Sequence, residues 1–164
     1  MFLLNTNPDY GRPLDSDDAE TLGSPAASEV ERVLSFRTNH AETPLVALPG
    51  LAAQLGVGAI HIKDEGHRLG LGSFKALGGA YAVIQLLLAE ARQTLGRAVD
   101  ISELHAPAVQ AIAHTLTFAC ATDGNHGRSV AQGAQFVGAR AGVFAHASIS
   151  LASRMSAVSV PTDW

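Results

Sequence analysis

The sequence predicts an α/β fold that contains a parallel β-α-β unit. Two segments rich in Thr, Phe or Val, TLTFACA at 115–121 and AGVFAHA at 141–147, are typical of strands. Between them lie a short polar loop and the amphipathic segment 128–138, which we expect to form a helix that ends at Gly138. A crossover helix that joins two strands of one sheet makes the strands parallel.

A long apolar helix is the second observation that favours this fold class. In GSFKALGGAYAVIQLLLAEA, residues 72–91, we expect Ser73 to be the N-cap, so that Lys75 falls in the first turn. The apolar residues from Tyr81 to Leu88 cover nearly every face of the helix. A helix that is apolar all round is expected to be buried.

Cap and turn residues place the elements that precede this helix. The Asn, Asp, Pro and Gly residues of segment 1–23 indicate an irregular or strand-like leader without a core of its own. Ser24, followed by Pro25 at the first helical position, begins a helix that we expect to run to about Thr38. The prolines of TPLVALPG, residues 43–50, predict an extended segment.

Three further elements are expected on either side of the long helix. A short helix at 51–55 stops at Gly56, and the alternation in AIHIKDE, residues 59–65, predicts a half-buried strand. Segment 89–113 is expected to contain the end of the long helix, a connection and a second short helix.

Composition and charge favour a globular, cytoplasmic protein. A chain of 164 residues that is 47% hydrophobic can bury a core. The net charge of −4 and the scattered Lys and Arg residues create no basic field, so we expect no nucleic-acid partner. The first ten residues lack the basic and apolar regions of a secretory signal, and we expect no membrane span.

The metal-binding residue types predict no metal site. Cys120 is a lone cysteine in a strand-like run, where a buried, unreactive thiol is the usual state. The seven histidines have none of the short paired spacings that zinc sites use.

Lys75 is the first candidate for chemistry. Burial and the positive end of the helix dipole would both favour the neutral amine, which is the form that attacks an aldehyde to make an imine. Gly78 and Gly79 follow on the same helix face. Two interpretations stay open: a flat ligand lies against this face, or the glycines admit a neighbouring helix while Lys75 extends to solvent.

The loop TDGNHG at 122–127 is the second candidate, because it lies between a strand and a helix, where α/β proteins bind ligands. Gly124 and Gly127 allow close approach of the backbone, and the amide of Asn125 can donate or accept a hydrogen bond. Asp123 can act as a proton acceptor, or it can simply cap the helix that follows.

Together, KDEGHRLGLGSFKALGGAYAV and ATDGNHGRSVA resemble the pyridoxal-phosphate (PLP) enzymes of the tryptophan-synthase β-like fold (fold type II), and within them the diaminopropionate ammonia-lyases. The resemblance extends from about residue 35 to 147 and includes TPL at 43–45. It implies that Lys75 binds the cofactor as an imine, that Phe74 packs beside the cofactor ring, and that Asn125, next to Gly124, bonds the ring's 3-oxygen. It also implies a small amino-acid substrate and, for a full-length protein, a homodimer.

The resemblance assigns a catalytic role to Asp123. Threonine and serine dehydratases of this fold usually have Ser two residues before the asparagine, whereas this sequence has Asp. A carboxylate here is suited to take the α-proton of 2,3-diaminopropionate, notably of its D-isomer. The expected reaction is α,β-elimination to pyruvate and ammonia.

The resemblance also implies an incomplete fold. Family members are longer, and their phosphate-binding and pyridine-nitrogen groups lie beyond the last residue of this sequence, so we expect 1–164 to be the N-terminal portion of such an enzyme. Residues 24–104 would belong to the larger lobe, which carries the cofactor lysine. Residues 114–147 would form a β-α-β unit of the smaller lobe. The alternatives are a threonine or serine dehydratase and a non-catalytic remnant or interaction module.

Overall fold

A computed structural model describes residues 3–122 and 124–144, and the chain divides into two compact units, 1–35 and 36–164. In the first unit, α1 (Ser16–Leu22) and α2 (Ser24–Ser35) pack on each other. The expectation of an irregular leader is therefore wrong for residues 16–22. The carboxylate of Asp15 accepts the N–H of Asp18 at 2.8 Å, so an acidic residue that suggested a turn caps a helix instead.

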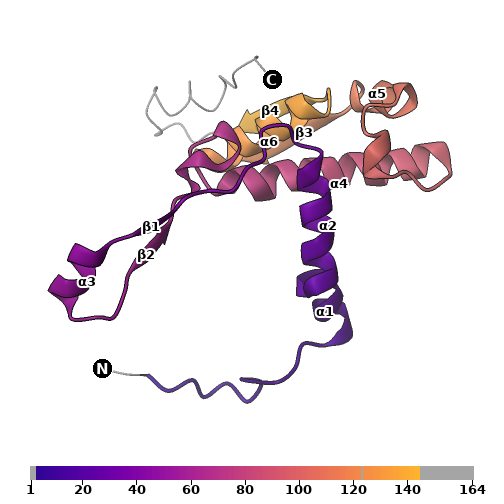
Figure 1. Ribbon diagram of the computed structural model, residues 1–164. Helices are drawn as coiled ribbons and strands as arrows, with labels where there is room; N and C mark the ends of the chain where they lie inside the picture. The colour runs from indigo at the N-terminus through magenta and orange to yellow at the C-terminus, as the bar shows by residue number, and fades with distance from the viewer. Residues whose placement is uncertain (1–2, 123, 145–164) are drawn as a thin grey trace. The chain divides into compact units, whose positions relative to one another are not determined.

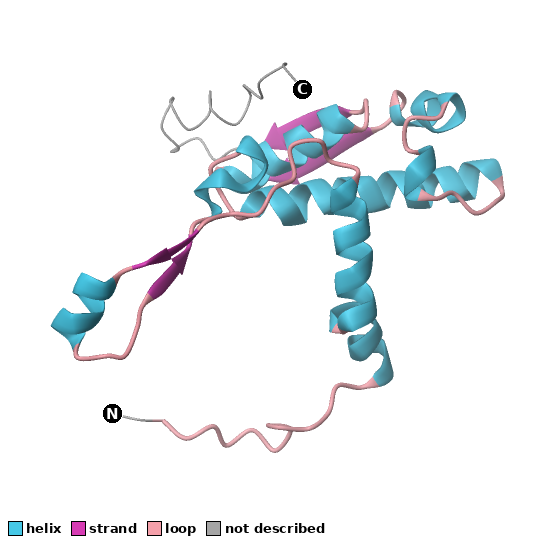
Figure 2. Cartoon of the chain, viewed as in Figure 1, coloured by secondary structure: helices cyan, strands magenta, loops and turns pink. Residues whose placement is uncertain are grey.

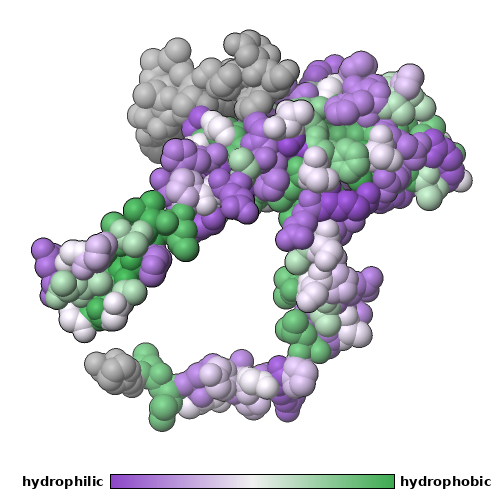
Figure 3. All heavy atoms as spheres, in the orientation of Figure 1, coloured by the Kyte–Doolittle hydropathy of each residue, from purple (hydrophilic) through white to green (hydrophobic). Residues whose placement is uncertain are grey.

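The second unit begins with a strand–helix–strand segment (Figure 1). Strands β1 (Leu45–Ala47) and β2 (His61–Lys63) pair antiparallel, and α3 (Pro49–Leu55) joins them and ends at Gly56. The expectation that the second strand is half-buried is wrong, because all six strand residues are exposed. No described element covers either face of this two-stranded ribbon, and Figure 3 shows apolar surface along it.

The rest of the second unit is built around two helices. A 3-10 helix η1 (Glu65–Gly70) leads into α4 (Lys75–Leu95), and η2 (Ile101–Glu103) and α5 (Pro107–Ala113) follow. Strand β3 (Thr117–Ala121), helix α6 (Asn125–Phe136) and strand β4 (Arg140–Phe144) complete the described chain. Strands β3 and β4 pair in parallel, which confirms the predicted β-α-β unit.

Helix α6 lies between the β3–β4 pair on one side and α4 on the other (Figure 2). Helix α4 is the centre of the core, although it is not buried all round as its composition predicted. It buries one side, with Ile84, Leu87 and Leu88 at most 1% exposed, while Leu86 is 58% exposed. Strand pairs and helices lie in separate layers here, as expected of an α/β fold.

The predicted lobes remain predictions. The boundary between compact units falls between residues 35 and 36, inside the segment that we assigned to the larger lobe. Helices α4 and α6, which we assigned to different lobes, pack directly on each other. None of the described helices has the length and the apolar character needed to span a membrane.

Candidate functional site

Helices α4 and α6 pack against each other, and small residues let their backbones approach closely. A Cβ placed on Gly79 would lie 2.5 Å from the Oγ of Ser129, and one on Gly133 would lie 2.8 Å from the Cα of Ala80. The same Oγ accepts the backbone N–H of Ala80 at 3.1 Å in the buried interface. Residues about 50 positions apart in the sequence therefore contact each other across the interface.

Two of the predicted site residues begin these two helices. Lys75 is the first residue of α4, one turn before Gly79, and Asn125 is the first residue of α6, one turn before Ser129. Both side chains are exposed. Among the described residues Lys75 is thus open to solvent, which is one of the two interpretations that the sequence left open, although the next residue, Ala76, is fully buried.

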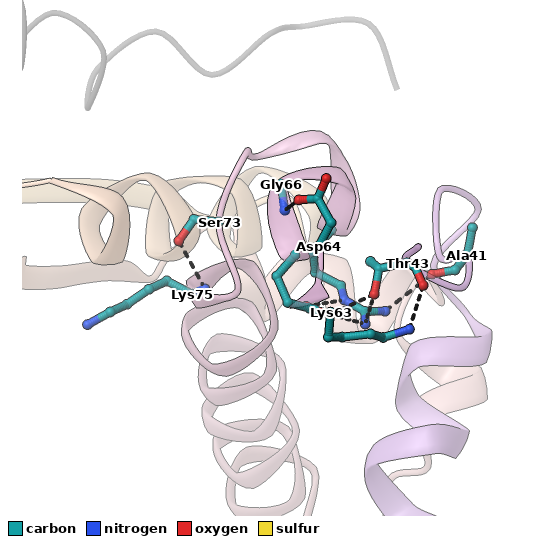
Figure 4. A network of polar contacts seen from close by, with 9 residues as sticks. Ala41, Thr43, Lys63, Asp64, Gly66, Ser73 and Lys75 are labelled. Atoms are coloured by element: carbon teal, nitrogen blue, oxygen red, sulfur yellow. Dashed lines mark hydrogen bonds and ion pairs between the residues drawn. The ribbon is translucent and has the colours of Figure 1, made fainter. Parts of the chain in front are cut away.

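The amine of Lys75 is available for reaction. Its Nζ lies 5.8 Å from the ring centroid of Phe74, which is itself 62% exposed. Among the described residues the amine has no hydrogen-bond partner and no ion pair, and Figure 4 shows its side chain extending away from Thr43 and Lys63. Lys63, the other lysine of the sequence, instead donates a hydrogen bond to the carbonyl oxygen of Thr43.

The paired glycines have different surroundings. Gly79 is buried against Ser129, as expected if it admits a neighbouring helix. Gly78 is exposed, and a Cβ built on it meets nothing within 4 Å. Only Gly78 therefore keeps the surface beside Lys75 open to a ligand.

Ser73 does not occupy the expected N-cap position. The N-cap of α4 is Phe74, which makes no side-chain capping bond. The hydroxyl of Ser73 nevertheless accepts the N–H of Lys75 at 3.2 Å. It therefore supports the first turn of α4 from one position earlier.

In the second loop, Asp123 lies outside the described residues. Gly124 precedes α6, and its N–H donates to the Oγ1 of Thr122 at 3.3 Å. The helix begins at Asn125, three residues earlier than predicted, so Asn125, His126 and Gly127 belong to its first turn rather than to a loop. Gly127 has a packing role, because a Cβ there would lie 2.5 Å from the Cγ2 of Thr122.

A polar network that the sequence did not reveal holds the TPL segment against the start of η1. The carboxylate of Glu65 accepts the hydroxyl of Thr43 at 2.7 Å and two N–H groups of Arg68 at 2.8 Å each. Arg68 also donates to the carbonyl oxygen of Ala41 at 3.2 Å. Hydrogen bonds from Arg68 and Thr43 lower the pKa of Glu65 to about 2.

Two side-chain amides hold the C-terminal part of η1, at Leu69. Leu69 has a φ of 47°, in the left-handed region that is unfavourable for a leucine. Its carbonyl oxygen accepts hydrogen bonds from Asn39 at 3.3 Å and from Gln132 at 2.9 Å. These contacts fix the backbone that leads to Lys75, and their long separation in sequence explains why no local pattern predicted them.

Thiol and metal chemistry receive little support from the geometry. Cys120 is half-buried, and burial raises the pKa of its thiol. Within residues 3–122 and 124–144, no three His, Cys, Asp or Glu side chains come together in a group that could hold a metal ion.

Two known proteins resemble a large part of this chain. Diaminopropionate ammonia-lyase of Salmonella typhimurium is 44% identical over 115 residues, which are 68% of this chain and 28% of that protein. The Escherichia coli protein of the same name is 47% identical over 103 residues, 62% of this chain and 24% of that protein. The chain thus spans about a quarter of the length of these relatives.

Solved structures of the Escherichia coli enzyme have the same fold. The complex with D-serine matches with a TM-score of 0.66 at 34% identity, covering 81% of this chain and 33% of that chain. The complex with an aminoacrylate-PLP azomethine reaction intermediate matches with a TM-score of 0.63 and covers 32% of that chain. These matches confirm the predicted tryptophan-synthase β-like fold, present here in part.

The match to a protein family covers most of the second unit. A family model described as pyridoxal-phosphate dependent enzyme matches residues 36–158 of the 164. This segment includes both motifs that suggested the resemblance, around Lys75 and Asn125. The chain belongs to the family of pyridoxal-phosphate dependent enzymes.

Proposed function

We propose that this chain carries the lysine-bearing part of a PLP-dependent ammonia-lyase that converts 2,3-diaminopropionate to pyruvate and ammonia. The observation that carries the proposal is that Lys75 and Asn125 each begin a helix, one turn before the Gly79–Ser129 contact that joins the two helices. Relatives named diaminopropionate ammonia-lyase, 44% and 47% identical, support the reaction class. The D-serine complex of a relative supports a D-amino acid as the substrate type.

The residues present fit the cofactor. The amine of Lys75 has no partner among the described residues that would have to be displaced before it binds an aldehyde. A pyridine ring needs an apolar neighbour and open space, which Phe74 and the side of α4 at Gly78 supply. A ring oxygen needs a donor, and the amide of Asn125 is exposed next to Gly124 at the first turn of α6.

Each site residue then has a chemical task. Lys75 holds the cofactor through its Nζ, Phe74 lies beside the ring, and Asn125 donates to the ring's 3-oxygen. Asp123 accepts the α-proton of the substrate. When bound, the cofactor supplies an electron sink for the charge left behind by that proton. The β-amino group leaves as ammonia, and hydrolysis of the released enamine gives pyruvate and a second ammonia.

Three broader statements belong to the same proposal. They are the division of residues 24–104 and 114–147 between two lobes, a homodimeric assembly of a full-length protein, and a cytoplasmic location without a nucleic-acid partner. Each is an inference from the sequence.

The cofactor assignment can be tested on the two lysines of the chain. PLP is added, the imine is reduced with borohydride, and the modified peptides are identified by mass spectrometry. We expect modification of Lys75 and little of Lys63, whose ammonium is occupied by Thr43. Lys75→Ala should abolish the imine absorbance band, whereas Lys63→Arg, the control, should keep it. Absence of a Lys75-dependent band in a full-length version would refute the assignment.

The reaction is tested separately by ammonia release from D- and L-diaminopropionate and from threonine. We expect release from diaminopropionate, and its loss in Asp123→Asn. A preference for threonine would favour the dehydratase alternative and overturn the role given to Asp123. A version that binds the cofactor but releases no ammonia from any of these substrates would favour a non-catalytic remnant.

A further inference from the structure

A cavity of about 420 Å³ lies within the second unit, away from the Lys75 end of α6. Its walls are residues 37–39 near the start of the unit, His105, and the last turns of α6, including Gln132 and Phe136. Seven to eleven residues separate this part of α6 from Asn125, which corresponds to about 10–16 Å along a helix. The volume is in the range of small-molecule sites, which span roughly 300–1,000 Å³.

Arg37 in this cavity is buried without a counter-charge. The residue is 5% exposed, and its guanidinium carbon lies 4.4 Å from the ring centroid of Phe136. Stacking covers a face of the guanidinium but leaves its N–H groups at the edge unused. No described carboxylate or carbonyl accepts a hydrogen bond from these groups, and burial alone lowers the pKa of Arg37.

Other arginines of the chain differ from Arg37 in this respect. Arg68 is bonded to Glu65 at 2.8 Å, and Arg97 is bonded to Glu103 at 2.7 Å. A buried charge without a partner destabilises the folded state. Arg37 is therefore in a position that favours an anion from outside the described chain.

Gln132 adds an unused acceptor to the same cavity. The residue is 2% exposed, and its Nε2 donates to the carbonyl oxygen of Leu69 at 2.9 Å. Its Oε1 is buried and has no partner among the described residues. A ligand that satisfies this atom must bring an N–H or O–H group.

The lining of the cavity has no acidic side chain that could balance Arg37. A planar carboxylate matches the fork of N–H groups on a guanidinium and can bind it through two parallel hydrogen bonds. The aromatic rings of Phe136 and His105, whose centroids are 5.5 Å apart, add an apolar wall.

We propose that this cavity binds a small organic acid, whose carboxylate pairs with Arg37 and whose neighbouring hydroxyl or amino group donates to Gln132. The site is separate from the cofactor end of α6. It requires neither PLP nor Lys75, so failure of the cofactor test leaves it unaffected.

The probe is glycolate, compared with glycolamide, which has nearly the same size and hydroxyl but no charge. Binding is followed by NMR of the side-chain N–H signals of Arg37 and Gln132 in the 164-residue chain. We expect saturable shifts of both signals with glycolate and none with glycolamide. Equal responses to the two compounds, or no response to glycolate, would overturn the proposal.

Substitution of Arg37 separates binding from a structural role. Arg37→Met keeps a long side chain against Phe136 but removes the charge, and we expect glycolate affinity to fall by about tenfold or more. Without ligand this variant should unfold at the same or a higher denaturant concentration than the wild type, because the unpaired charge is gone. Arg12→Met, at an exposed arginine of the first unit, is the control and should change neither quantity. Undiminished glycolate binding by Arg37→Met, or a clear loss of its stability without ligand, would contradict the proposal.

Discussion

Alanine substitutions at Gly78 and Gly79 should have opposite effects on stability, although the two residues are neighbours in one helix. Alanine is favoured over glycine in a helix by about 1 kcal/mol. At Gly78 nothing lies within 4 Å of the new Cβ, so Gly78→Ala should gain most of this amount. At Gly79 the new Cβ would lie 2.5 Å from the Oγ and 2.8 Å from the Cβ of Ser129.

The close contact of the new Cβ with Ser129 decides whether Gly79→Ala is stabilising or destabilising. Overpacking of a close interface costs about 1–3 kcal/mol. Moving Ser129 away also weakens its bond to the N–H of Ala80, which contributes about 1 kcal/mol. These losses exceed the gain in helix propensity, so Gly79→Ala should be less stable than the wild type by about 1–3 kcal/mol.

Urea unfolding of the two variants, followed by circular dichroism, measures both effects. The expected result is a higher midpoint for Gly78→Ala and a lower midpoint for Gly79→Ala, with similar slopes. Equal shifts in the same direction would refute the close packing of α4 on α6. Gly78→Ala also tests the open surface beside Lys75, since it should weaken cofactor binding if the ring lies there.

The remaining predictions concern the segment that precedes Lys75. The pKa of Glu65 is lowered from 4.5 to about 2, so the folded state resists protonation and the free energy of unfolding should fall as pH drops from 4.5 to 2. The measurement is the urea midpoint of unfolding at several pH values between 4.5 and 2. In Glu65→Gln the midpoint should change less with pH than in the wild type. An unchanged dependence of the midpoint on pH would contradict the bond to Arg68. Leu69→Gly removes the backbone strain of a leucine in the left-handed region, which costs about 1–2 kcal/mol. It also removes a buried side chain that contributes about 2–5 kcal/mol to stability. Because Leu69 is 1% exposed, we expect a net loss of stability in thermal unfolding, and a gain would mean that backbone strain dominates.

Sequence patterns predicted elements whose signals are local. The β3–α6–β4 unit, the extended TPL segment and the end of α3 at Gly56 all follow from side-chain period and turn residues. Helix α1 was missed because acidic residues favour both turns and helix N-termini, and only the bond from Asp18 to Asp15 distinguishes them. The start of α6 was placed too late because Gly127 suggested a turn. In the structure Gly127 lies within the helix, and its lack of a side chain lets Thr122 pack against it.

The candidate site could be predicted only in part. Lys75 and Asn125 were identified by their motifs, and each is the first residue of its helix in the structure. The exposure of Lys75 is one of the two interpretations that the sequence left open, because an apolar helix composition does not say what covers its first turn. The bonds of Thr43 to Glu65 and of Gln132 to Leu69 join residues 22 and 63 positions apart, beyond the reach of any periodic pattern.

The two small sheets affect how the chain behaves in solution. Among the described residues, each strand has a strand neighbour on one side only, so its other edge has no strand partner there. Such an edge pairs readily with any extended segment that reaches it. The edges of β3 and β4 are five residues long and those of β1 and β2 are three, so self-association should begin at the longer pair and increase with protein concentration.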